Sequence, residues 1–525
     1  MTIALCQIRP RLGDVSHNLE LALAEIKNHG DNIIVFPELF LLGYPPTDDM
    51  LISGVCEEIT NAIDALLKIS RKKSGLVVMG APVFDGKHWK NAALAIANGK
   101  IIHQHHKMCL PNYDVFNDAR YFTPGDQAVG FNWKGERLAL LICEDIWANI
   151  QAYPIDPVMQ LVGQGISTVI HLTASPFETC KLDQRIQQLR RVSSLTKSRV
   201  VSVNQVGGYS DILFDGQSIG VNAEGDLMNV WPAFKPVIGE MSFVKKEMIK
   251  KTVEDQIIEA ISFGLKEYME HAGFDSVVVG LSGGIDSALV AALAVHALGP
   301  KHVMLVALPT KYNTNETKQD AIEMAKRLGS ELVTIPIEME RQVFENKVLS
   351  LGKGVREITK QNIQARLRGL FLMAISNETG ALLLTTGNKS ELAMGYATLY
   401  GDRCGGLNII GDCFKTEVIK LAQAINEKYD WIPEGVIARP PSAELAPNQT
   451  DEDTLPPYET LDQILYQRMI EGFSLNQLLE LNDKNDVAFV LERLKMNEYK
   501  RGQSPPILKV STKSFGRGWQ YPLIR

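Results

Sequence analysis

The chain has 525 residues, a formal net charge of −7 and seven cysteines. Its length predicts roughly two to four domains, and its negative charge argues against a general nucleic-acid binder, which carries a basic excess. The odd cysteine count without CxxC pairs excludes a disulfide scaffold and favours the reducing cytoplasm. We expect no membrane span, because no run approaches the roughly 18–20 apolar residues required, and no secretory signal peptide at the N-terminus.

The first half of the chain alternates short apolar runs with stretches of helical spacing. Helices are predicted over residues 16–28 and 55–72, where Leu, Ile and Ala recur at helical intervals. Strands interspersed with helices predict a layered α/β domain. The predicted strands are residues 3–8, 32–36, 75–79, 91–97, 138–143 and 168–172.

The composition of the sequence changes between residues 240 and 256, where a charged stretch contains no apolar run typical of a strand. We therefore predict two domains, residues 1–245 and residues 246–525. The second domain opens with a helix over 253–271 and continues as alternating strands (276–281, 303–308, 332–335) and helices (288–298, 315–328). This alternation predicts a doubly wound parallel sheet. The Pro-rich and acidic segment 439–460 is predicted to be a loop or lid.

The segment GLSGGIDS joins a predicted buried strand to a predicted helix. Its glycines let the backbone approach a ligand, and the amides of a helix N-terminus attract anions. A tight turn would explain two glycines alone, but the strand, loop and helix together favour phosphate binding. The loop is not a Walker A sequence, and it resembles that of the ATP pyrophosphatase family, which implies cleavage of ATP to AMP and pyrophosphate. The implied ATP-binding residues are Gly280, Leu281, Ser282, Gly283, Gly284, Ile285, Asp286 and Ser287.

A second strand-and-loop segment, TTGNKSE, follows residue 382, and YGD and FKTEV come after it. Over residues 253–525 this order resembles NAD synthetases. The resemblance implies Mg²⁺ held by Asp286 and Glu391, with Glu391 also at the deamido-NAD site. Further implied ATP-binding residues are Thr386, Lys415 and Ser442. Further implied deamido-NAD-binding residues are Asn362, Leu399 and Lys500, and some relatives carry lysine where Leu399 stands.

Three residues with reactive side chains stand at the ends of apolar runs in the first half of the chain, namely Glu38, Lys107 and Cys143. A thiolate nucleophile needs a base and a nearby cation, which Glu38 and Lys107 can supply to Cys143. The alternative for one cysteine is an inert buried thiol. The motifs FPEL, KxxLPNY and CEDIW resemble those of the nitrilase superfamily, and the resemblance covers roughly residues 1–240. It implies an α-β-β-α sandwich and a Glu–Lys–Cys triad.

Fusion of these two domains implies a glutaminase that feeds an NAD synthetase, with a protected passage for ammonia. Glutamine is then expected at Tyr113, Ser175 and Lys181. Asp118 stands where relatives commonly have glutamate, and His171 where they often have asparagine. We interpret His171 as a buried strand histidine with a satisfied hydrogen bond. His105 and His106 lack a supporting cluster of metal ligands, so we interpret them as structural.

The sequence thus predicts an α/β enzyme of the glutamine-dependent NAD synthetase family, a cytoplasmic carbon–nitrogen ligase. It would use Mg²⁺, ATP, deamido-NAD and glutamine, without a nucleic-acid or membrane partner, and the family implies a homo-oligomer. Two alternatives remain open at this stage. The chain could be another amidotransferase of the ATP pyrophosphatase family that acts on a nucleotide or an amino acid. The first domain could instead be a catalytically silent binding or assembly module of an ammonia-dependent enzyme.

Overall fold

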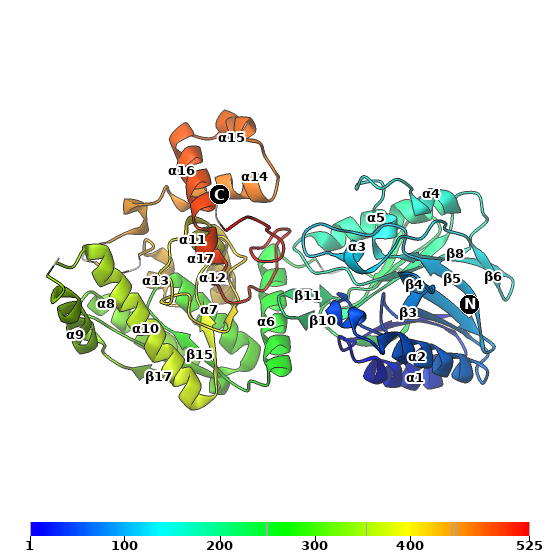
Figure 1. Ribbon diagram of the computed structural model, residues 1–525, viewed down its shortest axis with the longest axis horizontal. Coiled ribbons are helices and arrows are strands. Elements are labelled where there is room, and N and C mark those ends of the chain that lie inside the picture. The colour runs from blue at the N-terminus through cyan, green and yellow to red at the C-terminus, as the bar shows by residue number, and fades with distance from the viewer. Residues whose placement is uncertain (1, 248–249, 353, 443, 447–448, 524–525) are drawn as a thin grey trace. The chain divides into compact units, whose positions relative to one another are not determined.

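The computed structural model describes residues 2–247, 250–352, 354–442, 444–446 and 449–523. The chain forms two compact units (Figure 1). The first comprises the chain up to Gly207 together with Leu213–Lys250, and the second comprises Gly208–Ile212 and the chain from Lys251 onward. The described helices include none that is long and apolar enough to cross a membrane.

Two six-stranded mixed sheets form the centre of the first unit. Strands β1 to β3 are parallel in one sheet, and strands β7 to β9 are parallel in the other. The first sheet has the order β14 (Val237–Glu240), β1 (Ile3–Gln7), β2 (Ile33–Val35), β3 (Leu76–Phe84), β4 (Trp89–Ala97) and β5 (Lys100–His106). The second has the order β13 (Leu227–Val230), β12 (Ile219–Val221), β9 (Arg199–Asn204), β8 (Thr168–Thr173), β7 (Glu136–Ile142) and β6 (Phe131–Trp133). A separate hairpin consists of β10 (Val206–Tyr209) and β11 (Ile212–Asp215).

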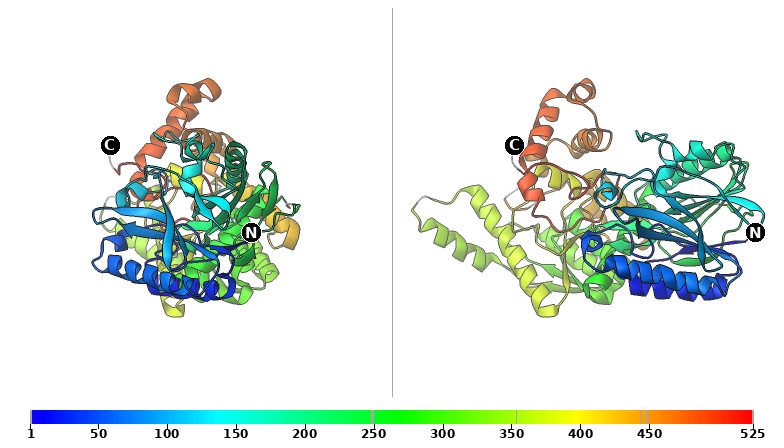
Figure 2. Two further views of the ribbon diagram at one scale, coloured as in Figure 1. Left: turned by 90° about the vertical axis from the view of Figure 1, so that its right-hand side faces the viewer. Right: turned by 45° about the vertical axis from the view of Figure 1, so that its right-hand side comes forward.

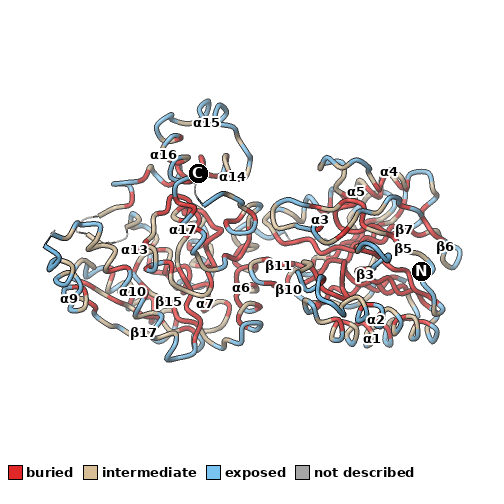
Figure 3. The backbone as a smooth tube through the Cα atoms, in the orientation of Figure 1, coloured by how far each residue is buried: buried red, intermediate tan, exposed pale blue. Residues whose placement is uncertain are grey.

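Helices cover the outer faces of the two sheets, which gives four layers in the order α-β-β-α (Figures 1 and 2). Apolar side chains from both sheets, including Leu5, Val35, Leu140 and Val201, pack between them. The residues of the inner strands are buried, as the tube colours of Figure 3 show. Because these strands are covered on both faces, their sequences are continuous apolar runs. The helices of this unit are α1 (Val15–His29), α2 (Val55–Ser70), α3 (Asp118–Tyr121), α4 (Pro157–Leu161) and α5 (Lys181–Thr196), with 3₁₀ turns η1 (Asp48–Leu51) and η2 (Cys143–Ile146).

A five-stranded parallel sheet organises the second unit. Its strand order is β17 (Glu331–Thr334), β16 (Val303–Ala307), β15 (Val277–Gly280), β18 (Leu382–Thr385) and β19 (Leu407–Asn408). The order reverses between β15 and β18, and ligands of doubly wound sheets bind at such a switch point, beyond the carboxyl ends of the strands. The strands and helices predicted for residues 253–335 are confirmed within a few residues at each end.

The helices of the second unit fall into two groups. Helices around the sheet are α6 (Val253–Ala272), α7 (Ile285–Leu298), α8 (Asn315–Leu328), α9 (Glu338–Leu349), α10 (Glu357–Thr379), α11 (Lys389–Met394), α12 (Lys415–Tyr429) and α13 (Glu434–Ala438), with η3 (Pro300–His302). Towards the C-terminus lie η4 (Asp451–Asp453), α14 (Tyr458–Met469), α15 (Leu475–Leu481), α16 (Lys484–Met496) and α17 (Glu498–Arg501).

The prediction that residues 439–460 form only a loop is wrong for the end of this segment. Asp451 lies in η4, Tyr458 begins α14, and both residues are buried. The Tyr458 hydroxyl donates a hydrogen bond of 2.8 Å to the Asp451 carboxylate. The proline-rich and acidic composition of the segment did not reveal this packing, because Tyr458 is buried against residues from elsewhere in the chain, such as Leu392 and Phe414. Residues 443, 447 and 448 of the segment are outside the described residues.

Candidate active sites

The predicted triad of the first unit lies at strand ends. Glu38 follows β2, Lys107 follows β5, and Cys143 is the first residue of η2 after β7. All three are buried, and the Lys107 Nζ atom lies 2.8 Å from Oε1 of Glu38. Burial raises the pKa of the Cys143 thiol, the charge of Glu38 raises it further, and the charge of Lys107 opposes both. The structure therefore brings a carboxylate and an ammonium within electrostatic reach of the thiol.

Asp118 completes this buried cluster. Its Oδ2 atom lies 2.6 Å from Lys107 Nζ, and its Oδ1 atom accepts a hydrogen bond of 2.8 Å from Tyr44. Two carboxylates thus share one ammonium, with both pairs fully buried. Burial raises the pKa of Glu38, Lys107 lowers it, and the charge of Asp118 raises it again. A carboxylate with a raised pKa can accept the thiol proton and return it later in the reaction.

Residues expected to hold glutamine lie around the residue that follows the nucleophile. The Tyr113 hydroxyl donates a hydrogen bond of 3.0 Å to the Glu144 carboxylate, and Tyr153 donates a second. Burial raises the pKa of Glu144, and the charges of Lys107 and Lys181 lower it. The sequence reasoning missed Glu144, although its place beside Cys143 in CEDIW was a signal. An acidic group here can bind a cation such as an α-ammonium group.

The other two expected glutamine ligands differ in their surroundings. Ser175 is buried after β8, where its amide donates to Asn204 and the preceding amide, that of Ala174, donates to Glu38 at 3.0 Å. Lys181 begins α5 and lies over the Trp147 ring, with its ammonium 2.8 Å from Glu178. The residue before Ser175 therefore contacts Glu38 through its amide, and the charge of Lys181 acts on Glu144.

A carboxylate that the sequence reasoning also missed connects the segments that carry Lys107 and Cys143. The Oδ1 atom of Asp145 accepts hydrogen bonds from the amides of Met108 and Cys109, at 2.9 and 3.0 Å. Its Oδ2 atom accepts from the Ile142 amide at 2.9 Å and from His105 Nε2 at 2.7 Å. His105 is thus structural, as expected, and no group of three or more metal-binding side chains occurs among the described residues.

The loop predicted to bind phosphate runs from the end of β15 to the start of α7. The hydroxyl oxygens of Ser282 and Ser287 lie 3.0 Å apart, and Ser282 accepts a hydrogen bond from the Gly284 amide. Gly283 has φ of +87°, and a Cβ atom there would lie 2.5 Å from the Thr317 carbonyl oxygen. Glycine is therefore required for both backbone conformation and space.

Carboxylates from both sides of the switch point meet around Lys415. Its ammonium contacts Oδ2 of Asp286 and lies 3.7 Å from Oε1 of Glu391. Asn388 donates a hydrogen bond of 2.8 Å to Asp286 and forms a capping box with Glu391 at the start of α11. Burial and then the charge of Asp286 raise the pKa of Glu391 to about 8, against the charge of Lys415. Two carboxylates that repel each other suit a divalent cation between them.

Two of the residues expected near deamido-NAD, Lys500 and Asn362, contact the segment 395–399, and a third, Leu399, lies within it. Lys500 donates hydrogen bonds of 2.7 and 3.0 Å to the carbonyls of Gly395 and Ala397. Asn362 on α10 accepts a hydrogen bond from the Thr398 hydroxyl at 2.9 Å. Leu399 offers only its backbone carbonyl, which accepts from Arg366 Nε at 3.1 Å.

The remaining expected ATP ligands are Thr386 and Ser442. Thr386 follows β18 at the carboxyl edge of the sheet, next to β15. The Ser442 hydroxyl donates to the Gln449 carbonyl and accepts from the Glu444 amide at 3.1 Å. Ser442 is therefore engaged within its own loop, whereas Thr386 lies where the strand order reverses.

Comparisons with known proteins identify the families of the two units. The family described as carbon-nitrogen hydrolase matches residues 2–238, and that described as NAD synthase matches residues 257–504. A glutamine-dependent NAD(+) synthetase from Synechocystis sp. is 36% identical, with 100% of this chain and 98% of the relative covered. One from Xylella fastidiosa (strain 9a5c) is 38% identical with the same coverage.

Solved structures give the same result. The structure of glutamine-dependent NAD+ synthetase from Acinetobacter baumannii in complex with ADP has 34% identity, covers 99% of this chain and 98% of its own, and superposes with a TM-score of 0.78. A glutamine-dependent NAD(+) synthetase from Cytophaga hutchinsonii, at 21% identity, shares the fold with a TM-score of 0.84 over 100% and 98% of the two chains. The chain therefore belongs to the glutamine-dependent NAD synthetase family and is a ligase with a nitrilase-type glutaminase unit and an ATP-dependent NAD synthase unit.

Proposed function

We propose that Cys143 releases ammonia from glutamine and that the second unit uses this ammonia to convert deamido-NAD into NAD through an adenylate. We assign the glutaminase to residues 1–245 and the synthetase to residues 246–525. The observation that carries the glutaminase assignment is the fully buried contact between Lys107 and Glu38 beside the Cys143 thiol. A silent binding module would have no use for two buried carboxylates around one ammonium, because burying charge is costly.

The first reaction begins when Glu38 takes the thiol proton of Cys143 and the sulfur attacks the side-chain amide carbon of glutamine. Lys107 stabilises the negative oxygen of the tetrahedral intermediate. Glu38 returns the proton to the leaving nitrogen, the C–N bond breaks, and ammonia departs. Water, deprotonated by Glu38, then cleaves the thioester to glutamate and free thiol. Tyr113, Ser175 and Lys181 would hold the substrate together with Glu144, whose carboxylate suits the α-ammonium group.

The second reaction activates a carboxylate, whose oxygen is a poor leaving group. The nicotinate carboxylate of deamido-NAD attacks the α-phosphate of ATP, pyrophosphate leaves, and an acyl adenylate forms. Ammonia then attacks the acyl carbon, and AMP departs with the bonding electrons. The loop Gly280–Ser287, Thr386, Lys415 and Ser442 would hold ATP. Residues of the second strand-and-loop region would hold deamido-NAD, namely Asn362, Glu391, Leu399 and Lys500.

Asp286 and Glu391 would hold Mg²⁺. Their fit rests on geometry, because the Lys415 ammonium contacts Oδ2 of Asp286 and lies 3.7 Å from Oε1 of Glu391, so both carboxylates face one site. The ion, when bound, neutralises phosphate charge. In the structure Lys415 contacts both carboxylates, so this lysine can turn towards the phosphates once a cation replaces its charge.

The test of this function supplies the full chain with deamido-NAD, ATP and Mg²⁺, and with either glutamine or ammonium. We expect NAD from both nitrogen sources. Cys143→Ala should lose glutamine use and keep ammonium use, and Asp286→Ala should lose both. Cys6→Ala removes another buried thiol, from β1, and serves as the matched control that keeps both activities. No NAD from either source in the unmodified enzyme would refute the function, and persistent glutamine use in Cys143→Ala would refute the nucleophile.

We also propose a cytoplasmic homo-oligomer. All seven cysteines are free thiols, which suits a reducing compartment. Helices α9 and α10 expose large apolar side chains, among them Phe344, Ile358 and Leu370, and such a surface favours association. Light scattering coupled to size-exclusion chromatography tests this: a Leu370→Glu variant should dissociate, and a mass of about 58.2 kDa for the unmodified protein would contradict it.

A further inference from the structure

One buried guanidinium in the second unit lacks the partners that burial demands. Arg403 lies between α11 and β19 and is 6% exposed. Its Nη1 atom donates a hydrogen bond of 3.3 Å to the Ser504 hydroxyl, whereas buried Nε and Nη2 find no hydrogen-bond partner among the residues that the structure describes. A buried donor without a partner costs roughly 1–3 kcal/mol, and more when it is charged.

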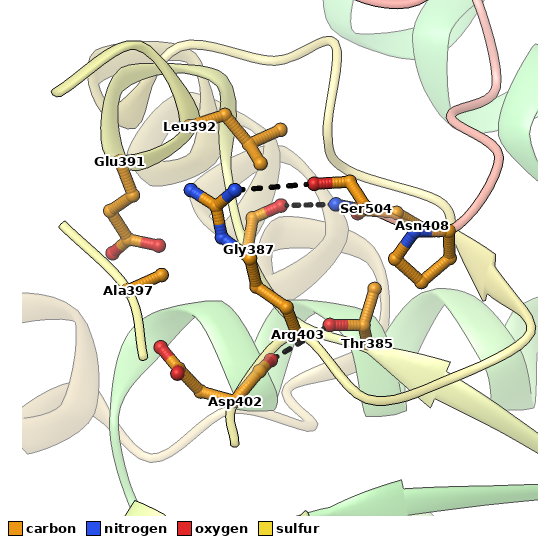
Figure 4. Close-up of a pocket in the computed structure, with 10 residues that line it drawn as sticks. Thr385, Gly387, Glu391, Leu392, Ala397, Asp402, Arg403, Asn408 and Ser504 are labelled. Carbon is orange, nitrogen blue, oxygen red and sulfur yellow. Dashed lines mark hydrogen bonds between the residues drawn. The ribbon is translucent and has the colours of Figure 1, made fainter. Parts of the chain in front are cut away.

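The unpartnered atoms form one edge of the guanidinium. The N–H bonds of Nε and Nη2 are parallel, and this fork matches the two oxygens of a carboxylate or phosphate. In Figure 4 the edge away from Ser504 faces the side where Glu391 and Ala397 lie. Burial lowers the pKa of Arg403, and the neighbouring charge of Asp402 opposes that effect. Asp402 forms no ion pair with Arg403 in the described part of the chain, and one of its oxygens accepts from the Thr398 amide.

Arg403 lines two cavities. The smaller is also lined by Thr385, Gly387, Glu391 and Asn408 (Figure 4). The larger has a volume of about 330 Å³ and is lined by Leu399, Tyr400 and Met373 among others. This volume falls within the range of about 300–1,000 Å³ that is usual for small-molecule sites. Arg403 thus lines one cavity together with Glu391 and another together with Leu399, and both of these residues are assigned above to deamido-NAD.

The charged groups around Arg403 indicate which ligand its Nε–Nη2 edge binds. Glu391 and Asp402 both line the smaller cavity with Arg403, so a third carboxylate that enters this site would be repelled by two others. An unpaired guanidinium offsets that repulsion. Two nearby lysines are already engaged: Lys500 donates to two backbone carbonyls, and Lys415 contacts Asp286 and Glu391.

We propose that the Nε–Nη2 edge of Arg403 binds the nicotinate carboxylate of deamido-NAD before it is activated. This inference rests on the proposed function of the second unit. The carboxylate is anionic and planar in the substrate, and it becomes a neutral amide in the product. Arg403 therefore binds deamido-NAD more tightly than NAD. Amidation removes the negative charge that the guanidinium binds, and this loss favours release of NAD.

The test compares binding of deamido-NAD and of NAD to the full chain by isothermal titration calorimetry. Arg403→Met should weaken deamido-NAD binding about 10- to 100-fold, the usual effect of a lost charged hydrogen-bonded pair. It should weaken NAD binding by less than about threefold on the same grounds. Arg403→Lys keeps the charge without the two parallel N–H donors. Its preference for deamido-NAD over NAD should therefore lie between that of the unmodified protein and that of Arg403→Met. Ammonium-dependent kcat/KM should follow deamido-NAD affinity, while glutamine hydrolysis stays unchanged.

Equal losses for both dinucleotides would assign Arg403 to a phosphate group and overturn the proposal, as would no loss for either. The control is Arg341→Met on α9, whose guanidinium is buried but paired with Glu338 and Glu345 and should leave selectivity unchanged. Because the Nε–Nη2 edge of Arg403 is unpaired without ligand, Arg403→Met should keep or raise the Tm. If Arg403→Met unfolds, the binding of deamido-NAD and of NAD to Arg403→Lys tests the proposal in its place. Failure of the unmodified enzyme to form NAD would refute the proposed function instead, which keeps the two failures distinguishable.

Discussion

The Nε2 atom of His171 lies 3.1 Å from the backbone carbonyl oxygen of Cys143. Because a carbonyl only accepts, Nε2 carries the proton, and Nδ1 accepts from the Ser202 hydroxyl at 2.8 Å. Cys143 has φ of 41°, a left-handed conformation that costs free energy for a residue with a side chain. His171 therefore stabilises the strained backbone of the nucleophile, and it is a buried strand histidine with satisfied hydrogen bonds, as expected.

Removing this support should impair the glutaminase alone. We expect His171→Ala to lower glutamine-dependent kcat/KM about 10- to 100-fold, because it removes one hydrogen bond to a buried carbonyl next to the nucleophile. His171→Asn can still donate a hydrogen bond and should recover part of the loss. Steady-state NAD formation with glutamine and with ammonium measures both, and an equal loss with ammonium would show a global defect instead.

His171 also makes stability depend on pH. Burial lowers its pKa from 6.5 to about 4, against a hydrogen bond to Cys143. Between these values the unfolded chain binds a proton that the folded chain does not, so stability falls as pH drops from 6.5 to 4. The loss is up to about 3 kcal/mol. Thermal unfolding of the unmodified chain and of His171→Asn between pH 4 and 7 measures it. The Tm of the unmodified chain should fall more steeply towards pH 4, and parallel curves would contradict the assignment.

Asp118 should set the acid limb of the glutaminase pH profile. Its charge raises the pKa of Glu38. Asp118→Asn should therefore lower that pKa and shift the acid limb of glutamine-dependent kcat/KM to lower pH, since Glu38 must be ionised to accept the thiol proton. Asp118→Glu restores the charge and should restore the limb. An unshifted limb in Asp118→Asn would mean that another group controls it.

Asp145 should position the catalytic segments. An Asp145→Asn variant would keep one acceptor oxygen for the four donors that the carboxylate serves, so we expect a loss of roughly 2–4 kcal/mol in stability. Because these donors flank Lys107 and Cys143, kcat for glutamine should fall more than KM rises. Asp156→Asn, which alters a partly exposed cap of α4, is the control that should leave kcat intact.

Lys415 should act only in the synthetase. Lys415→Met removes the cation that contacts Asp286 and Glu391, so NAD formation should fall about 100-fold or more with either nitrogen source, the scale of losing a charge that stabilises a transition state. Hydrolysis of glutamine, followed as glutamate release, should continue. Lys428→Met on the same helix, whose exposed ammonium pairs with Asp255, is the control. Retained NAD formation in Lys415→Met would exclude a role at the phosphates.

The sequence alone determined the fold class and most of the chemistry. Buried strands of both units are continuous apolar runs, and the loop at Gly283 needs glycine for local steric reasons, so both are visible in short windows of sequence. Glu38, Lys107 and Cys143 could be predicted because they stand in short motifs that resemble the nitrilase superfamily, and Asp286 because it opens the helix after the glycines.

Only the tertiary structure decided which charges share a site. Asp118 and Glu38 are far apart in sequence, yet both contact Lys107. Asp145 accepts hydrogen bonds from four donors in two segments of the chain. The buried end of segment 439–460 packs in a way that its loop-like composition does not predict. The unpaired edge of Arg403 is the clearest case, because a missing partner cannot be read from a sequence. Pairing energies depend on distance and burial, and long-range folding sets both.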